Sequence, residues 1–108
     1  MNKEFYYRLD IAASAIVRRG KELAKGEEEL QEWLKDYLTV ITAIEKYLLD
    51  LKEIWGNPKA DEGLKKLEGL ESVEDLKGLE EALKSLKEEL SEVYNRYMDE
   101  VIASRGGK

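Results

Sequence analysis

The sequence predicts an all-α protein, an up-down-up bundle of three long helices with one short helix packed across the end. Apolar residues recur at helical spacing along three long segments. Glu, Lys and Leu dominate, as they do in long helices, and 43% of the residues are hydrophobic, which is too many for a disordered chain. The same observations leave one alternative, a four-helix bundle with one truncated helix. The chain has 108 residues, enough for one domain, which we place at residues 1–105 with a frayed tail at 106–108.

The first helix is expected at about residues 3–24, with one apolar face. The middle of this face is shallow, because it contains Ala12, Ala13 and Gly20. A shallow face lets a neighbouring backbone approach closely, or alternatively leaves room for a ligand; close packing is the simpler interpretation. Gly26 then ends the helix, because glycine suits the left-handed residue that follows a helix C-terminus. So short a connection makes the first two helices antiparallel neighbours.

The second helix, at about residues 27–55, carries the most regular apolar pattern. Its main row alternates steps of four and three residues and consists of Leu30, Leu34, Tyr37, Ile41, Ile44, Leu48, Leu51 and Trp55. A second row repeats every seventh residue along one shoulder and consists of Trp33, Val40, Tyr47 and Ile54. So broad a stripe predicts a helix with neighbours on two sides. Because one short helix cannot cover the shoulder, we expect Val40, Tyr47 and Ile54 to form a partner interface.

A short helix is expected at about residues 58–68, followed by a last long helix that ends near residue 104. Asn57 would be the N-cap of the short helix and Pro58 its first residue. Residues 72–75 resemble a capping box in front of the last helix.

Helix lengths decide between the two arrangements. At 1.5 Å per residue, the short helix spans only about 16 Å, whereas the second helix spans roughly 43 Å. If the short helix climbed halfway and the last helix then descended, much of the last helix would hang past the end of the bundle. We therefore place the short helix across the bottom, with the last helix antiparallel to the second.

In this arrangement the top of the bundle gathers polar and aromatic side chains from three helices. They are Arg19, Trp33, Tyr37, Tyr94, Tyr97 and Glu100. An unpaired charge in the core is unfavourable, so we expect Arg19 to reach outward and pair with Glu100 or Glu32. The alternative is a ligand-binding pocket, in which Arg19 anchors an anion and the aromatic rings form the walls.

The composition excludes many activities. The chain contains neither Cys nor His, so disulfides, thiolate nucleophiles, the usual catalytic triad and the commonest transition-metal ligand are all absent. Several of its carboxylates occur as adjacent pairs, and neighbouring residues point to different faces of a helix. We therefore expect no enzyme, no cofactor and no metal site.

The net charge of −6 argues against nucleic acid and anionic membranes as partners. A basic cluster near the end of the first helix is small and has acidic neighbours; it consists of Arg18, Arg19, Lys21 and Lys25. No segment approaches the roughly 18 apolar residues of a membrane span, and the N-terminus lacks the apolar region of a signal peptide. We expect no membrane contact and, for a natural protein, a cytoplasmic location.

Residues that degrade at high temperature are scarce, while Glu and Lys are abundant. This balance is typical of hyperthermophile proteins and also of designed ones. Gly63, Gly69 and Gly78 count against design, because a glycine inside a helix costs about 1 kcal/mol relative to alanine.

These observations favour a non-enzymatic scaffold or protein-interaction module that binds a protein partner or a second copy of itself, as a homodimer. The first alternative is a small-molecule-binding bundle that uses the Arg19 pocket. The second alternative is a nucleic-acid accessory protein that uses the basic cluster.

Overall fold

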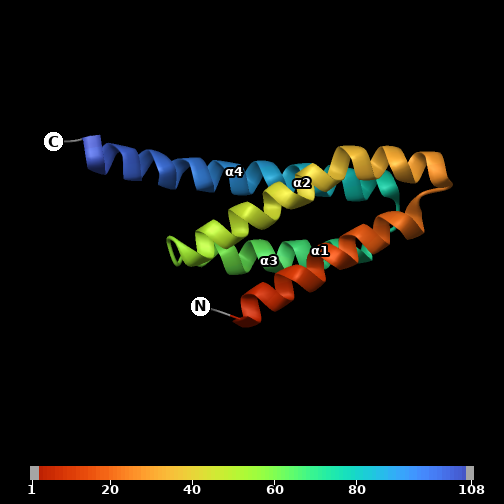
Figure 1. The fold of residues 1–108 in the computed structure, drawn as a ribbon, viewed down its shortest axis with the longest axis horizontal. Coiled ribbons are helices and arrows are strands. Elements are labelled where there is room, and N and C mark those ends of the chain that lie inside the picture. The colour runs from red at the N-terminus through yellow and green to blue at the C-terminus, as the bar shows by residue number, and fades with distance from the viewer. Residues whose placement is uncertain (1–2, 107–108) are drawn as a thin grey trace.

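The computed structural model describes residues 3–106, which form four α-helices and one turn of 3-10 helix (Figure 1). The helices are α1 (Lys3–Leu23), α2 (Glu27–Glu53), α3 (Lys59–Gly69) and α4 (Leu76–Gly106), with the 3-10 turn η1 (Leu70–Ser72) between the last two. The predicted all-α bundle of three long helices and one short helix is confirmed. Of the tail predicted at 106–108, Gly106 ends α4, and residues 107–108 lie outside the described part.

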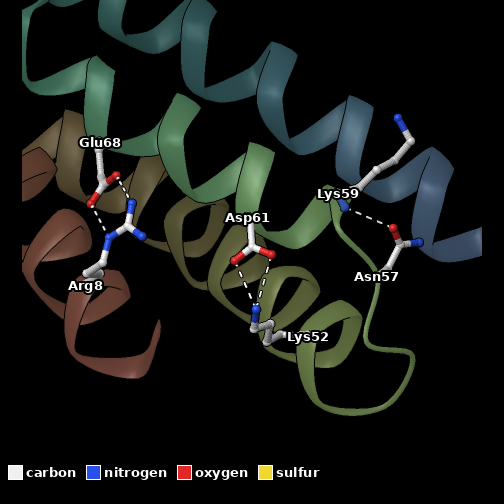
Figure 2. Close-up of polar contacts among 6 residues, drawn as sticks. All are labelled: Arg8, Lys52, Asn57, Lys59, Asp61 and Glu68. Atoms are coloured by element: carbon white, nitrogen blue, oxygen red, sulfur yellow. Dashed lines mark hydrogen bonds and ion pairs between the residues drawn. The ribbon is translucent and has the colours of Figure 1, made fainter. Parts of the chain in front are cut away.

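The helices alternate in direction, so α1 and α3 run one way while α2 and α4 run the other (Figure 1). The short helix α3 therefore climbs back along the bundle, as in the four-helix alternative with one truncated member. Two ion pairs lie along its course (Figure 2): Asp61 at its start accepts hydrogen bonds from Lys52 Nζ at 3.0 and 3.2 Å, and Glu68 near its end pairs with Arg8 at 2.6 Å. The expectation that α4 runs antiparallel to α2 was wrong, because α3 reverses the chain once more.

An apolar face explains why α3 packs along the bundle rather than across its end. Ala60, Gly63, Leu64 and Leu67 are all buried. Gly63 is the close point of contact, since a Cβ atom there would lie 2.6 Å from Leu48 Cδ2 and 3.0 Å from a methyl group of α4. A helix so narrow at its middle fits between α2 and α4.

The core is apolar and centred on α2, which packs against α1, α3 and α4. The largest fully buried side chains of the core are Trp33, Ile16, Ile41, Ile44, Leu48, Leu51, Leu64, Leu67, Leu79 and Leu83. The shallow face of α1 accommodates the ring of Trp33, because a Cβ atom at Gly20 would lie only 2.4 Å from Trp33 Cζ3. Close packing, the simpler interpretation of that face, is confirmed.

Helix ends follow the predicted rules in part. Asn57 Oδ1 accepts a hydrogen bond from the Lys59 backbone N–H at 2.9 Å, as expected of an N-cap (Figure 2). The left-handed glycine lies at Gly56 (φ 55°), whereas Gly26 is extended (φ 179°), so the prediction for Gly26 was wrong. At the start of α4, Asp75 Oδ1 accepts a hydrogen bond from the Gly78 backbone N–H at 2.7 Å. The Ser72 hydroxyl donates to the Gly69 carbonyl and does not cap α4, so the capping box predicted at residues 72–75 was wrong.

Candidate functional site

The six residues predicted to form one polar-aromatic layer lie at two different levels of the bundle. Arg19 and Trp33 lie where α1 meets the start of α2. Tyr94 lies near the other end of α2, where its hydroxyl donates to Asp50 Oδ2 at 2.9 Å. The predicted layer was wrong because it assumed that α4 is antiparallel to α2. The two helices are parallel, so the aromatic residues in the C-terminal half of α4 lie beside the C-terminal end of α2.

At the Trp33 end of the bundle, the tryptophan side chain is buried between helices. Trp33 is 2% exposed and stacks on Tyr37 at 6.0 Å between ring centroids. Arg19 lies half-buried beside the link between η1 and α4, where its Nε donates to the Val73 carbonyl at 2.8 Å and its Nη1 to Glu22 Oε1 at 3.3 Å. The predicted pairing of Arg19 with Glu100 or Glu32 was wrong, and its guanidinium instead ties α1 to the chain that leads into α4.

An open groove lies between α2 and α4 beside Trp33. Its lining residues are mostly acidic and consist of Glu29, Glu32, Trp33, Asp36, Leu76, Lys77 and Glu80. Carboxylates of this number repel an anion, so the groove does not match the anion pocket expected around Arg19. Within residues 3–105 no group of three or more acidic side chains is arranged to hold a metal ion.

The shoulder of α2 that was predicted to stay open is largely covered by α4. Val40 and Tyr47 pack against the core as half-buried residues. The ring of Tyr47 lies 5.0 Å from that of Tyr94 on α4. Of the three predicted interface residues only Ile54 remains open, with 64% of its surface exposed.

The Trp55 end of the bundle is open, because α4 continues beyond the turn that joins α2 to α3 (Figure 1). We call residues 97–105 the α4 end. Apolar side chains follow this segment: Tyr97 and Val101 are half-buried, Met98 is 37% exposed and Ile102 is 62% exposed. A notch lies where the α4 end leaves the body, lined by Trp55, Tyr97, Glu100, Val101, Ser104 and Arg105. The α4 end and the turn beside it thus form an apolar surface that faces solvent.

Aromatic and polar contacts hold the base of the α4 end in place. Trp55 lies between two rings of α4, with centroid distances of 5.5 Å to Tyr94 and 5.6 Å to Tyr97. Asp50 Oδ2 accepts hydrogen bonds from the Tyr94 hydroxyl at 2.9 Å and from Lys46 Nζ at 3.0 Å. The hydrogen bond to Asp50 raises the pKa of the Tyr94 hydroxyl, and burial raises it further. The α4 end therefore starts from a fixed anchor.

Sequence reasoning missed the α4 end as a surface. Its signal was present in the apolar row of the last helix, which continues through Val93, Tyr97 and Val101. The length comparison had also identified the overhang that the four-helix alternative requires. The predicted up-down-up arrangement conceals this surface, because it places these residues inside the bundle.

No protein-family model matches the chain, and comparison with curated proteins and with solved structures finds no match either. None of the helices in residues 3–106 combines the length and the apolar character that crossing a membrane requires. Any inference about function therefore rests on the surfaces of the fold itself.

Proposed function

We propose that this protein is a non-enzymatic interaction module that binds a partner protein through the α4 end. One observation supports the proposal most: α4 continues past the turn after α2 (Figure 1), and its side chains Met98 and Ile102 face solvent there. Contiguous exposed apolar residues of this kind are typical of protein interaction sites.

The residue types and their spacing suit the recognition of a helix or of an apolar groove. Tyr97 and Val101 are four residues apart on one face, and Met98 and Ile102 repeat the same spacing beside them. Such pairs are the anchors by which amphipathic helices bind. Trp, Tyr and Met are also enriched in the buried centres of interfaces.

A binding segment that is already folded loses less conformational entropy when it binds a partner. The α4 end is already helical and anchored by Trp55, so a partner would not have to order it on binding. Burial of its exposed apolar surface would contribute about 25 cal/mol per Å².

A matched pair of variants tests the proposal. M98E/I102E places two carboxylates on the apolar face of the α4 end, whereas N95E/A103E adds the same charge at other exposed positions of the same helix. We expect proteins retained by the immobilised wild-type chain and by N95E/A103E to be lost from M98E/I102E, with equal helical circular dichroism for all three. Equal retention by both variants, or retention by none of the three chains, contradicts the proposal.

A further inference from the structure

A second surface, on α1 and α2, carries little charge in a chain of which 39% is charged. Residues 11–17 of α1 and residues 38–44 of α2 contain no charged side chain at all. The two stretches lie side by side, because α1 and α2 are antiparallel and contact each other beyond each end of these stretches. Gly20 meets Trp33 toward one end, and Lys52 Nζ lies 5.2 Å above the Phe5 ring toward the other.

Large apolar side chains of these stretches face solvent. Ile11 is 49% exposed and Leu38 is 46% exposed. Ser14 and Thr42 in the same stretches are also exposed, and Val17 is half-buried. We call these five residues the neutral belt. Tyr7, one turn before Ile11, is 68% exposed and extends it.

Opposite charges border the neutral belt at its two ends. Asp10 and Glu45 lie at one end, where burial and the charge of Asp10 raise the pKa of the Glu45 carboxyl. Arg18, Lys21 and Lys35 lie at the other end. None of the five takes part in an ion pair or side-chain hydrogen bond within residues 3–105, although ion pairs form elsewhere on the same helices.

We propose that the neutral belt is the interface of a symmetric dimer, in which each α1 lies antiparallel to α1 of the second copy and each α2 antiparallel to α2. A two-fold axis that crosses the helices at right angles places the acidic end of each copy on the basic end of the other. An axis parallel to the helices would instead place like charges together, which is unfavourable. The charge pattern therefore selects both the occupant and its orientation.

The register of the two helix pairs agrees. If Glu45 faces Lys35 of the second copy, the axis crosses α2 at the level of residue 40, midway between them. If Asp10 faces Lys21 of the second copy, with Arg18 beside it, the axis passes close to Ala15. Ala15 follows Asp10 by five residues and Val40 precedes Glu45 by five, so in antiparallel helices the two positions lie at one level. One axis thus satisfies both charge pairs and stacks Leu38 on Thr42 of the second copy.

This dimer goes beyond the proposed function, because it uses a different face and does not require the α4 end. Variants of Lys35 and Glu45 test it by sedimentation equilibrium, in which the single chain has a mass of 12.5 kDa. We expect the wild type to dimerise at low ionic strength, and the dimer to weaken as salt rises from about 0.05 to about 0.5 M, because the Debye length shortens.

Charge reversal supplies the decisive comparison. K35E and E45K each place like charges across the axis, so each raises the dissociation constant about tenfold or more. The double variant K35E/E45K exchanges the two charges and restores the wild-type constant. K65E on α3 and E92K on α4 make the same charge changes at exposed positions off this face, and we expect them to leave the constant unchanged.

Three results overturn the inference. The first is a wild-type chain that stays monomeric at every concentration tested. The second is a K35E/E45K dimer that dissociates as readily as those of the single variants. The third is loss of the dimer in M98E/I102E but not in K35E, which assigns self-association to the α4 end. Loss of partner retention by M98E/I102E with an intact dimer leaves both proposals standing, so the two are tested separately.

Discussion

The two tryptophans of this chain lie near opposite ends of α2 and differ in what surrounds them. Trp33 is 2% exposed, held between Gly20 of α1 and Tyr37. Trp55 is half-buried at the edge of the core, where it contacts the rings of Tyr94 and Tyr97 on α4. The difference follows from where helices stop: at the Trp33 end α1, α2 and the start of α4 come together, whereas past Trp55 only α4 continues. The same residue type therefore serves the core at one end and an exposed surface at the other.

Removal of each indole tests whether the two ends of the bundle are packed differently. W33A leaves a cavity in the core, and we expect it to lower the free energy of unfolding by about 3–5 kcal/mol. W55A removes a half-buried ring, so we expect less than half of that loss. Urea unfolding followed by circular dichroism measures both. Equal losses would mean that the two ends are packed alike.

A smaller effect is expected where α1 approaches Trp33. G20A places a methyl group against the Trp33 ring, with only 2.4 Å available, and should lower the free energy of unfolding by about 1–3 kcal/mol. Gly69 is the matched control, since it is helical (φ −69°) and has no atom within 4 Å of a built Cβ. G69A should therefore stabilise the protein by up to about 1 kcal/mol. Destabilisation by both variants to the same extent would remove the special role of Gly20.

The hydrogen bond between Tyr94 and Asp50, at the base of the α4 end, can be tested by removal of one hydroxyl group. Y94F removes the hydroxyl that donates to Asp50, and we expect it to lower the free energy of unfolding by about 1 kcal/mol. We also expect faster amide exchange in the α4 end, because ring contacts without the hydrogen bond then hold its base. Wild-type exchange rates in the α4 end of Y94F would show that the hydrogen bond does not anchor it.

The smallest effect concerns Glu45, whose carboxyl pKa lies above its ordinary value of 4.5 because of burial and of Asp10. The folded state therefore disfavours the ionised carboxylate relative to the unfolded chain. E45Q should raise the free energy of unfolding of the dilute monomer by less than about 1 kcal/mol at pH 7. The gain is full above the raised pKa and disappears below pH 4.5, where both states are protonated. Thermal unfolding across pH measures it, and a gain that persists at low pH contradicts this cause.

Helices and core rows could be predicted from the sequence because each depends on local spacing. The row from Leu34 to Trp55 and the shallow face of α1 both lie against the core, as the pattern requires. The course of α3 could not be settled by length alone. It depends on burial of Leu64 and Leu67 and on the space that Gly63 leaves between two other helices, which are contacts distant in the sequence.

That one reversal of direction accounts for the errors in the predicted sites. It moved Tyr94 and Tyr97 from the Trp33 end to the Trp55 end, and it brought α4 over Val40 and Tyr47. The conformation of Gly26 is a separate case: both connections contain a glycine after the helix, but only Gly56 is left-handed.

Amide hydrogen exchange along α4, on the dilute protein without a partner, tests the difference between the two ends most directly. Backbone amides exchange slowly in helical segments that are packed against the core. An uncovered segment opens locally at a lower free energy, so its amides exchange faster. We expect slow exchange from Leu79 to Val93, where the row is buried, and markedly faster exchange in the α4 end. Equal protection along the whole of α4 would show that its end is covered, and would contradict an open apolar surface at the Trp55 end of the bundle.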